Sequence, residues 1–440
     1  MGRIWMSQMM GAIADLGLPF FDRPARLPPV ETARKLCHDL LSDHGEASGT
    51  ALAREVIALY RELQPEDRVH FIEMLAEDFA PDTTALRAAA ECWLGNPDQS
   101  NYLALMRAVD SPRQELLRRM NMAPGATGVI VGMRETLLDL LPAHPELRTL
   151  DADFRHLFES WFNRGFLQFE RIDWRTAAAV LEKLIAYEAV HEIRGWSDLR
   201  RRLADDRRCF AFFHPALTDE PLIFVEVALT QGIAQQIQPL LDSPPQKLDD
   251  VAPDTAVFYS ISNCQAGLAG ISFGNFLLKQ VVDALRTELP DIKNFVTLSP
   301  MPNFCRWISG LNGMDGADAP DWLGEDDRAA LTEPDWQIDE AVRAANQKVL
   351  MKLAAHYLAR AGRKGRPADP VARFHLGNGA SIEQINWAGD LSEKGLRQSA
   401  GLMVNYRYDS ASIVANHEAF ASEGEIAVSS RVRSLLNGRK

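Results

Sequence analysis

A glycine-rich turn in the middle of the chain has the composition of a phosphate-binding loop. Gly267, Gly270 and Gly274 follow the apolar run 255–262 and lead into a helical pattern over 274–289. Free N–H groups and the dipole at a helix start attract an anion, and glycines let phosphate oxygens approach the backbone. We therefore predict a ligand that carries phosphate. The alternative is that the glycines serve only tight turns.

The same turn contains a second motif with a different chemical meaning. Gly270-Ile-Ser272-Phe-Gly274 matches the G-x-S-x-G nucleophile elbow of α/β-hydrolases, which would make Ser272 a nucleophile. An elbow turns directly from strand to helix, whereas about eight residues separate this motif from the apolar run. The spacing also fits neither G-x-G-x-x-G nor a Walker loop, so dinucleotide and nucleoside triphosphate binding lose support.

Two further polar residues follow apolar segments. Ser299 ends the apolar run 294–299, and Pro300 restricts it to extended geometry, so its hydroxyl is expected at a strand end. The alternative is that this stretch starts a helix, with either Ser299 or Asn303 as its N-cap. His375 lies in a turn rich in glycine and asparagine, where a lone histidine is more often structural than functional.

The elements that must position these residues change type along the chain. Apolar residues recur at helical spacing from about residue 29 to 164, with breaks at prolines, which predicts an antiparallel helical bundle. After residue 166, β-rich runs alternate with helical patterns, which predicts a mixed sheet. The β-rich runs are 208–213, 221–230, 255–262 and 294–299, and the helical patterns are 274–289, 339–361 and 410–436. We predict an α+β protein with a helical domain over 1–165 and a mixed domain over 166–440, and we read 359–370 as a solvated loop.

Composition excludes several classes of protein. The 440 residues are 46% hydrophobic and 24% charged, which is typical of a globular protein, and the net charge of -13 argues against a nucleic-acid partner. An anionic ligand would need a local positive site. Five scattered cysteines predict reduced thiols and no metal site, and no apolar run approaches the ~18 residues of a membrane helix. We expect a cytoplasmic protein without a membrane partner.

Several long stretches in the second half resemble malonyl-CoA decarboxylases. They are 210–236, 258–276, 298–304, 375–380, 385–387 and 401–408. The resemblance implies a helical oligomerisation domain, a catalytic domain with the acetyltransferase (GNAT-like) fold, and a homotetramer assembled through the helical domain. It also implies conversion of malonyl-CoA to acetyl-CoA and CO2. The thioester accepts the electrons in that reaction, so no cofactor is expected.

The resemblance assigns roles to residues that match the family's motifs. It implies that Ser299 is the catalytic serine and His375 the catalytic histidine. Our hypothesis for their roles is that Ser299 hydrogen-bonds the malonyl carboxylate or the enolate-like transition state, and that His375 protonates the carbanion. The resemblance also implies an acyl-CoA-binding loop, made of Ala269, Gly270, Ile271, Ser272, Phe273, Gly274 and Asn275. Animal members of the family carry a glutamate at the position of Ser272. Asn378, Asn405 and Tyr406 are weaker candidates for positioning.

Three other functions stay open on the sequence alone. An acyl-CoA-dependent acyltransferase could use the same loop, with a base that activates an amine or a hydroxyl. A non-catalytic regulator could bind acyl-CoA and use the helical half as an interaction platform. A hydrolase with Ser272 as its nucleophile is the third alternative.

Overall fold

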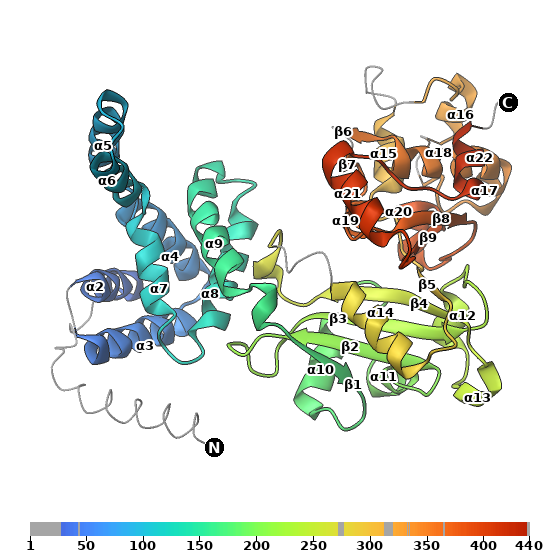
Figure 1. Cartoon of the computed structure of the whole chain (residues 1–440), viewed down its shortest axis with the longest axis horizontal. Helices are drawn as coiled ribbons and strands as arrows, with labels where there is room; N and C mark the ends of the chain where they lie inside the picture. Colours follow the sequence, from blue (N-terminus) through green and yellow to red (C-terminus); the bar gives the residue numbers. More distant parts are fainter. Residues whose placement is uncertain are drawn as a thin grey trace. The chain divides into compact units, whose positions relative to one another are not determined.

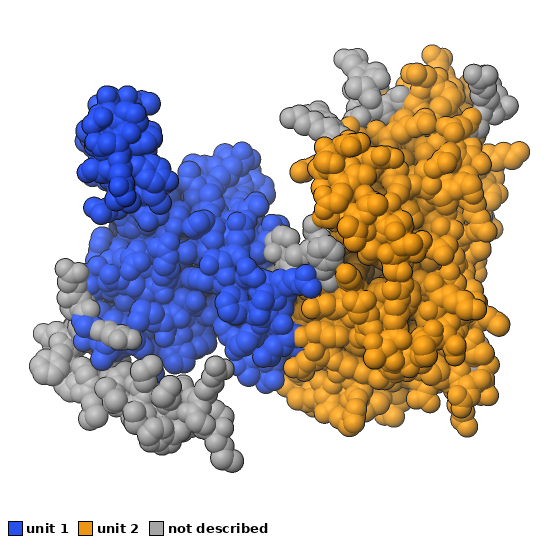
Figure 2. All heavy atoms as spheres, in the orientation of Figure 1, with its two compact units in different colours: residues 1–168, 213–220, 265–273 blue, residues 169–212, 221–264, 274–440 orange. Residues whose placement is uncertain are grey.

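The structure is a computed structural model that describes residues 28–42, 45–271, 277–311, 320–331, 333, 335–363 and 366–437. The chain folds into two compact units, drawn in different colours in Figure 2. Unit 1 consists of residues 1–168, 213–220 and 265–273, and unit 2 of residues 169–212, 221–264 and 274–440. Two short segments of the second half of the sequence, 213–220 and 265–273, therefore pack with the helical half. The predicted division at residue 165 placed both segments in the mixed domain.

Unit 1 is helical, as the periodicity of the first half predicts. Its helices are α2 (Pro29–Leu41), α3 (Glu46–Glu62), α4 (Pro65–Asp78), α5 (Thr83–Gly95), α6 (Gln99–Val109), α7 (Pro112–Met120), α8 (Ala126–Leu140) and α9 (Arg148–Trp161). Pro65 and Pro112 occupy first positions of helices, where the missing N–H costs no hydrogen bond. The helices α5 and α6 lie side by side and extend away from the others of this unit (Figure 1).

Unit 2 is built on a mixed sheet. Its strands are β1 (Gln168–Ile172), β2 (Arg207–Phe213), β3 (Pro221–Thr230), β4 (Thr255–Asn263), β5 (Asn294–Thr297), β8 (Ser381–Asn386) and β9 (Met403–Arg407), in the order β1-β2-β3-β4-β5-β9-β8. The strands β4 and β5 are parallel, whereas β3–β4, β5–β9 and β8–β9 are antiparallel. The predicted α+β class, helical first and mixed afterwards, is confirmed.

Helices and a short hairpin complete unit 2 (Figure 1). The helices are α10 (Ala178–Tyr187), α11 (Trp196–Arg202), α12 (Gln238–Asp242), α13 (Leu248–Val251), α14 (Leu277–Glu288), α15 (Phe304–Gly310), α16 (Glu325–Ala330), α17 (Glu340–Ala345), α18 (Gln347–Ala359), α19 (Pro370–Gly377), α20 (Glu393–Ser399), α21 (Ile413–Glu423) and α22 (Ser430–Asn437). The hairpin pairs β6 (Gly362–Arg363) with β7 (Arg366–Pro367). It lies within the segment predicted as a loop.

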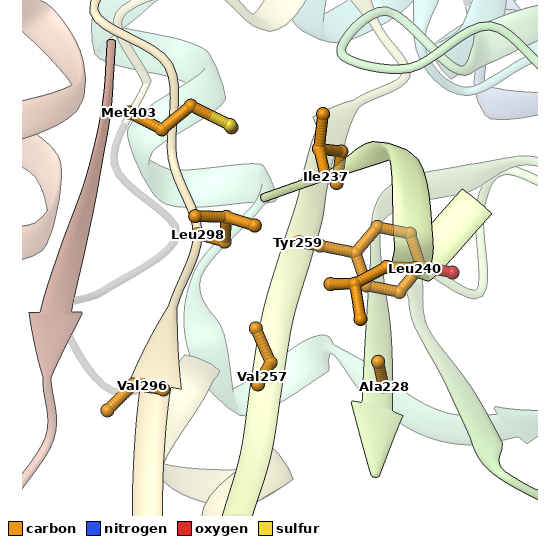
Figure 3. Packing of buried hydrophobic residues seen from close by; sticks show 8 residues of the cluster. All are labelled: Ala228, Ile237, Leu240, Val257, Tyr259, Val296, Leu298 and Met403. Atoms are coloured by element: carbon orange, nitrogen blue, oxygen red, sulfur yellow. The ribbon is translucent and has the colours of Figure 1, made fainter. Parts of the chain in front are cut away.

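One face of the sheet carries a buried apolar cluster that holds β4, β5 and β9 together. Val257, Tyr259, Val296, Leu298 and Met403 point into it, and α12 covers it with Leu240 (Figure 3). Successive side chains of a strand point to opposite faces. The neighbours of these residues, including Thr297 and Ser299, are therefore turned to the other face.

Two long helices predicted from the sequence are each divided. The pattern over 339–361 forms α17 and α18, because Asn346 ends the first and its side-chain amide donates to the Val342 carbonyl at 2.9 Å. The pattern over 410–436 forms α21 and α22, because Gly424 adopts a left-handed conformation (φ 68°) that ends α21. In the described part of the chain, no helix is long and apolar enough to cross a membrane.

Candidate active site

Ser299 lies where the chain crosses from one neighbouring strand to another. The Leu298 N–H still donates to the Phe258 carbonyl of β4, at 2.9 Å. One residue later, Ser299 exchanges two backbone hydrogen bonds with Val404 of β9, both at 2.9 Å. The predicted strand-end position is therefore observed, and the backbone of Ser299 is fixed on both sides. Asn303, and not Ser299, is the N-cap residue of α15, and its side chain makes no capping hydrogen bond.

His375 lies in the last turn of α19. Asp369 begins this helix, because its carboxylate accepts from the Ala372 N–H at 2.9 Å, and Pro370 follows at the first helical position. Gly379 turns the chain away with φ 81°, and a Cβ there would lie 2.1 Å from the Ile413 carbonyl oxygen. The helix therefore ends at Asn378 and Gly379, and the histidine is helical, not part of a turn.

The side chains of these two residues meet. Ser299 Oγ lies 3.2 Å from His375 Nε2, and it donates to Thr297 Oγ1 at 2.9 Å. On the other side of the ring, His375 Nδ1 lies 2.7 Å from the Tyr408 hydroxyl. Since the Ser299 proton points to Thr297, the serine oxygen is left to accept from Nε2–H. Nδ1 then accepts from the Tyr408 hydroxyl, and the four groups form one ordered chain of hydrogen bonds.

Burial decides the charge of this group. His375 is 2% exposed and Ser299 is 6% exposed. Desolvation lowers the pKa of His375 to about 3, so the ring is neutral at physiological pH in the free protein. Burial also raises the pKa of Tyr408 well above its usual value, so the Tyr408 hydroxyl keeps its proton. A buried carboxylate in the place of Tyr408 would favour the imidazolium, as in serine hydrolases. The tyrosine favours a neutral hydrogen-bonding pair instead.

The three weaker candidates have different surroundings. The Tyr406 ring stacks on the His375 ring with centroids 4.5 Å apart, which restricts the orientation of the imidazole. Asn405 is fully buried and donates to the Thr297 and Ala234 carbonyls, so its amide holds the chain beside the site. Asn378 donates to the Phe374 carbonyl at 2.7 Å and ends α19.

Sequence reasoning missed Thr297 and Tyr408. Each lies two residues from a residue that it did single out, Ser299 and Tyr406, on a strand that presents alternate residues to one face. The period of two was therefore a usable signal. It could not show that the two strands bring these side chains to the same histidine.

We expect Tyr408→Phe to lower kcat about three- to tenfold with little change in KM, because it removes one hydrogen bond to a ring that must keep its orientation. The phenyl group keeps the packed volume, so the fold should persist. Steady-state kinetics would test this. An unchanged kcat would show that Nδ1 needs no fixed partner.

The predicted acyl-CoA-binding loop begins in unit 1. Arg134 of α8, 1% exposed, donates to the carbonyl oxygens of Gly267 and Ala269 at 2.7 and 2.9 Å. A Cβ on Gly267 would lie 2.0 Å from the Val131 carbonyl oxygen, so only glycine allows this close packing on α8. Gly270 has φ 76°, and the Ile271 side chain is buried.

The remaining residues of this loop, Ser272, Phe273, Gly274 and Asn275, lie outside the described residues. The assignment of the loop to acyl-CoA, and of Ser272 to any role, therefore stays a prediction. Lys279, in the first turn of α14, is exposed.

Comparison with known proteins gives one consistent result. Residues 165–440 match the family model described as malonyl-CoA decarboxylase C-terminal domain, and residues 79–162 match the model of the N-terminal domain. The mitochondrial malonyl-CoA decarboxylase of Anser anser anser is 33% identical over 444 residues, which covers 93% of this chain and 86% of that protein. The corresponding enzyme of Rattus norvegicus is also 33% identical, over 84% of this chain and 82% of the relative.

Solved structures agree. The crystal structure of malonyl-CoA decarboxylase from Rhodopseudomonas palustris superimposes with a TM-score of 0.85 at 50% identity, covering 92% of this chain and 99% of that one. The enzyme from Agrobacterium vitis gives a TM-score of 0.83 at 49% identity with the same coverage.

Proposed function

The chain belongs to the malonyl-CoA decarboxylase family, and from this premise we propose that Ser299 and His375 carry out the decarboxylation of malonyl-CoA to acetyl-CoA and CO2. The observation that supports these roles is the buried contact of 3.2 Å between Ser299 Oγ and His375 Nε2. The two residues are 76 positions apart in the sequence, so the fold brings them together.

The electron movement defines what the site must do. The bond between the carboxylate carbon and the adjacent methylene carbon breaks, CO2 leaves, and the electron pair passes into the thioester as an enolate. Negative charge grows on the thioester oxygen, so donors aimed at that oxygen stabilise the transition state more than the ground state. In the proposal, the Ser299 hydroxyl turns from Thr297 to the substrate and is one such donor.

The enolate then needs one proton on carbon. We assign its delivery to His375 Nε2. The ring is neutral in the free protein because it is buried, and an enolate beside it would raise the pKa of the imidazole. Because Nε2 already carries a hydrogen, the ring takes up a proton from water at Nδ1, in place of the bond from the Tyr408 hydroxyl, and passes the Nε2 proton to carbon. The reaction consumes one proton for each CO2 released, and the histidine returns to its neutral form.

This order of steps predicts the pH dependence of kcat/KM, which reports ionisations of the free enzyme. With the pKa of His375 lowered to about 3, the free ring does not titrate between roughly pH 6 and 8. Cleavage needs only the neutral donors, so we expect kcat/KM to stay level across this range when cleavage limits the rate. A tenfold fall for each unit of rising pH would show that the imidazolium is required before cleavage.

The direct test of the function is product formation by purified protein from malonyl-CoA, with EDTA present and no acyl acceptor added. We expect acetyl-CoA and CO2 in equal amounts. Products that appear only with an added amine or alcohol would indicate an acyltransferase. Tight binding of malonyl-CoA without turnover would indicate a regulator. Retained activity in EDTA would also agree with the thioester serving as the electron acceptor.

Two finer expectations belong to the same proposal. We propose a homotetramer assembled through the helical half, supported by exposed apolar side chains on α5 and α6, such as Leu94 (81% exposed) and Val109 (57%). Light scattering should then give a mass four times 49.0 kDa. We also propose a cytoplasmic location, which cell fractionation tests, although the curated relatives named above are mitochondrial.

A further inference from the structure

We propose that unit 1 holds the phosphate groups at the nucleotide end of the CoA substrate, in a hollow on α9 whose positive charge comes from Arg148 and Arg155. The inference rests on the proposed function, since it concerns how the same thioester substrate is held. It assigns a part in substrate binding to the helical half, for which the resemblance to the family implies only oligomerisation.

The hollow follows one face of a single helix. Arg148, Ala152, Arg155 and Glu159 recur at spacings of four, three and four residues, which places them along the same side of α9. Together with Asp151, His156 and Leu141 they line a cavity of about 500 Å³.

The charge of this hollow is available to a ligand. Asp151 is bound to Arg134, with Nε and Oδ1 2.8 Å apart, so one acidic neighbour is already neutralised. Arg148 and Arg155 are exposed, and neither forms an ion pair within the part of the chain that the structure describes. Glu159 is the remaining acidic side chain of the hollow. Two arginines and one further carboxylate leave the hollow with a positive balance.

The hollow reaches the predicted phosphate loop. Arg155 Nη1 lies 3.9 Å from the point where a Cβ would stand on Gly270. Gly270 belongs to the segment that Arg134 fixes through the carbonyl oxygens of Gly267 and Ala269. Arg134 therefore links the two features, because its guanidinium contacts both the loop and Asp151 of the hollow. All of these residues belong to unit 1.

Phosphate chemistry fits this arrangement. The guanidinium of arginine is always charged, and its planar set of donors matches phosphate oxygens. CoA carries a diphosphate and a 3′-phosphate at its nucleotide end. A chain of net charge -13 repels such a polyanion on average, so binding needs a local positive site. Arg148 and Arg155 provide one, and Arg155 lies beside Gly270, where the missing side chain leaves the backbone open to close approach.

The test compares three substrates: malonyl-CoA, malonyl-3′-dephospho-CoA and malonyl-pantetheine. We expect Arg155→Ala and Arg148→Ala each to raise KM for malonyl-CoA about tenfold with kcat unchanged, the effect of losing one charge-assisted contact. With malonyl-pantetheine, which lacks the phosphates, KM should equal that of the unaltered protein. Arg433→Ala, at an exposed arginine of α22, is the matched control and should change nothing.

The dephospho substrate identifies the phosphate. If the variants lose their effect with it, the hollow holds the 3′-phosphate; if they keep their effect, the hollow holds the diphosphate. Both results support the proposal. An unchanged KM for malonyl-CoA would overturn it, as would an equal rise with malonyl-pantetheine, which would mean that the substitutions act through the fold.

A binding measurement separates this inference from the proposed function. Calorimetry with adenosine 3′,5′-bisphosphate, which carries a 3′-phosphate and a 5′-phosphate but no thioester, should show binding that weakens about tenfold in Arg155→Ala. Suppose that the unaltered protein makes acetyl-CoA, but that it and Arg155→Ala bind this probe with equal affinity. The phosphate-binding role of the hollow is then refuted, and the proposed function is not. Arginine-dependent binding of the probe without decarboxylation would refute the function and support the hollow.

Discussion

Ser299→Ala is expected to lower kcat by about 10²–10³, the effect of removing one donor to a developing oxyanion. The residue is held in place for this role by its backbone bonds to Val404, and its hydroxyl donates to Thr297 Oγ1 at 2.9 Å until it turns to the substrate. Alanine keeps the backbone bonds and leaves no buried partner charged, so the fold should be preserved.

Kinetics with malonyl-CoA would check this, with KM expected to stay within about threefold of that of the unaltered protein. Ser434→Ala is the matched control, because Ser434 is an exposed serine of α22 whose hydroxyl donates to the Ser430 carbonyl of the same helix. A kcat within about threefold of normal in Ser299→Ala would remove this hydroxyl from the mechanism.

His375→Ala is expected to lower kcat by about 10²–10⁴, the contribution of a positioned proton donor. The loss has two origins. The ring delivers the proton to carbon, and its Nε2–H also fixes the Ser299 oxygen at 3.2 Å. Removal of the ring leaves a gap beside Tyr406 and an unpaired Tyr408 hydroxyl, so thermal unfolding must be measured beside the kinetics.

His375→Gln separates the two origins, because the glutamine side chain can still donate a hydrogen bond but cannot act as an acid near neutral pH. We expect it to fold with near-normal stability and still to lose at least about 10² in kcat. His70→Ala, at an exposed histidine of α4, is the matched control. Near-normal turnover in His375→Gln would show that the proton comes from another group.

Strands of the sheet that carries the site could be predicted because their own residues are typical of β-strands. The runs 221–230 and 294–299 are apolar, rich in β-branched residues and bounded by turn residues, and they appear as β3 and β5. Their pairing was not predictable. The parallel contact of β4 with β5, and the insertion of β9 beside β5, depend on residues far apart in the sequence.

The first half shows the same limit. Periodicity and prolines predict its helices, but nothing local indicates that 265–273 packs on α8. That contact depends on the absence of a side chain at Gly267 and on a single arginine, Arg134. The division of 339–361 and 410–436 into shorter helices also depends on single residues, Asn346 and Gly424.

For the site, Ser299 was accessible to physical reasoning because a proline fixes its conformation. His375 was not, since an isolated histidine before glycines resembles many structural ones, and only the resemblance to the family singled it out. Thr297 and Tyr408 could not be found from the sequence alone. Their contacts depend on the pairing of β5 with β9 and on the position of His375 of α19 beside Tyr408.

The most direct test of the central claim is a crystal structure of the His375→Gln variant with malonyl-CoA bound. We predict that Ser299 Oγ lies about 3 Å from an oxygen of the malonyl group and that the methylene carbon faces the residue 375 side chain. A malonyl group bound away from both residues, in a complex that still decarboxylates slowly, would contradict this claim.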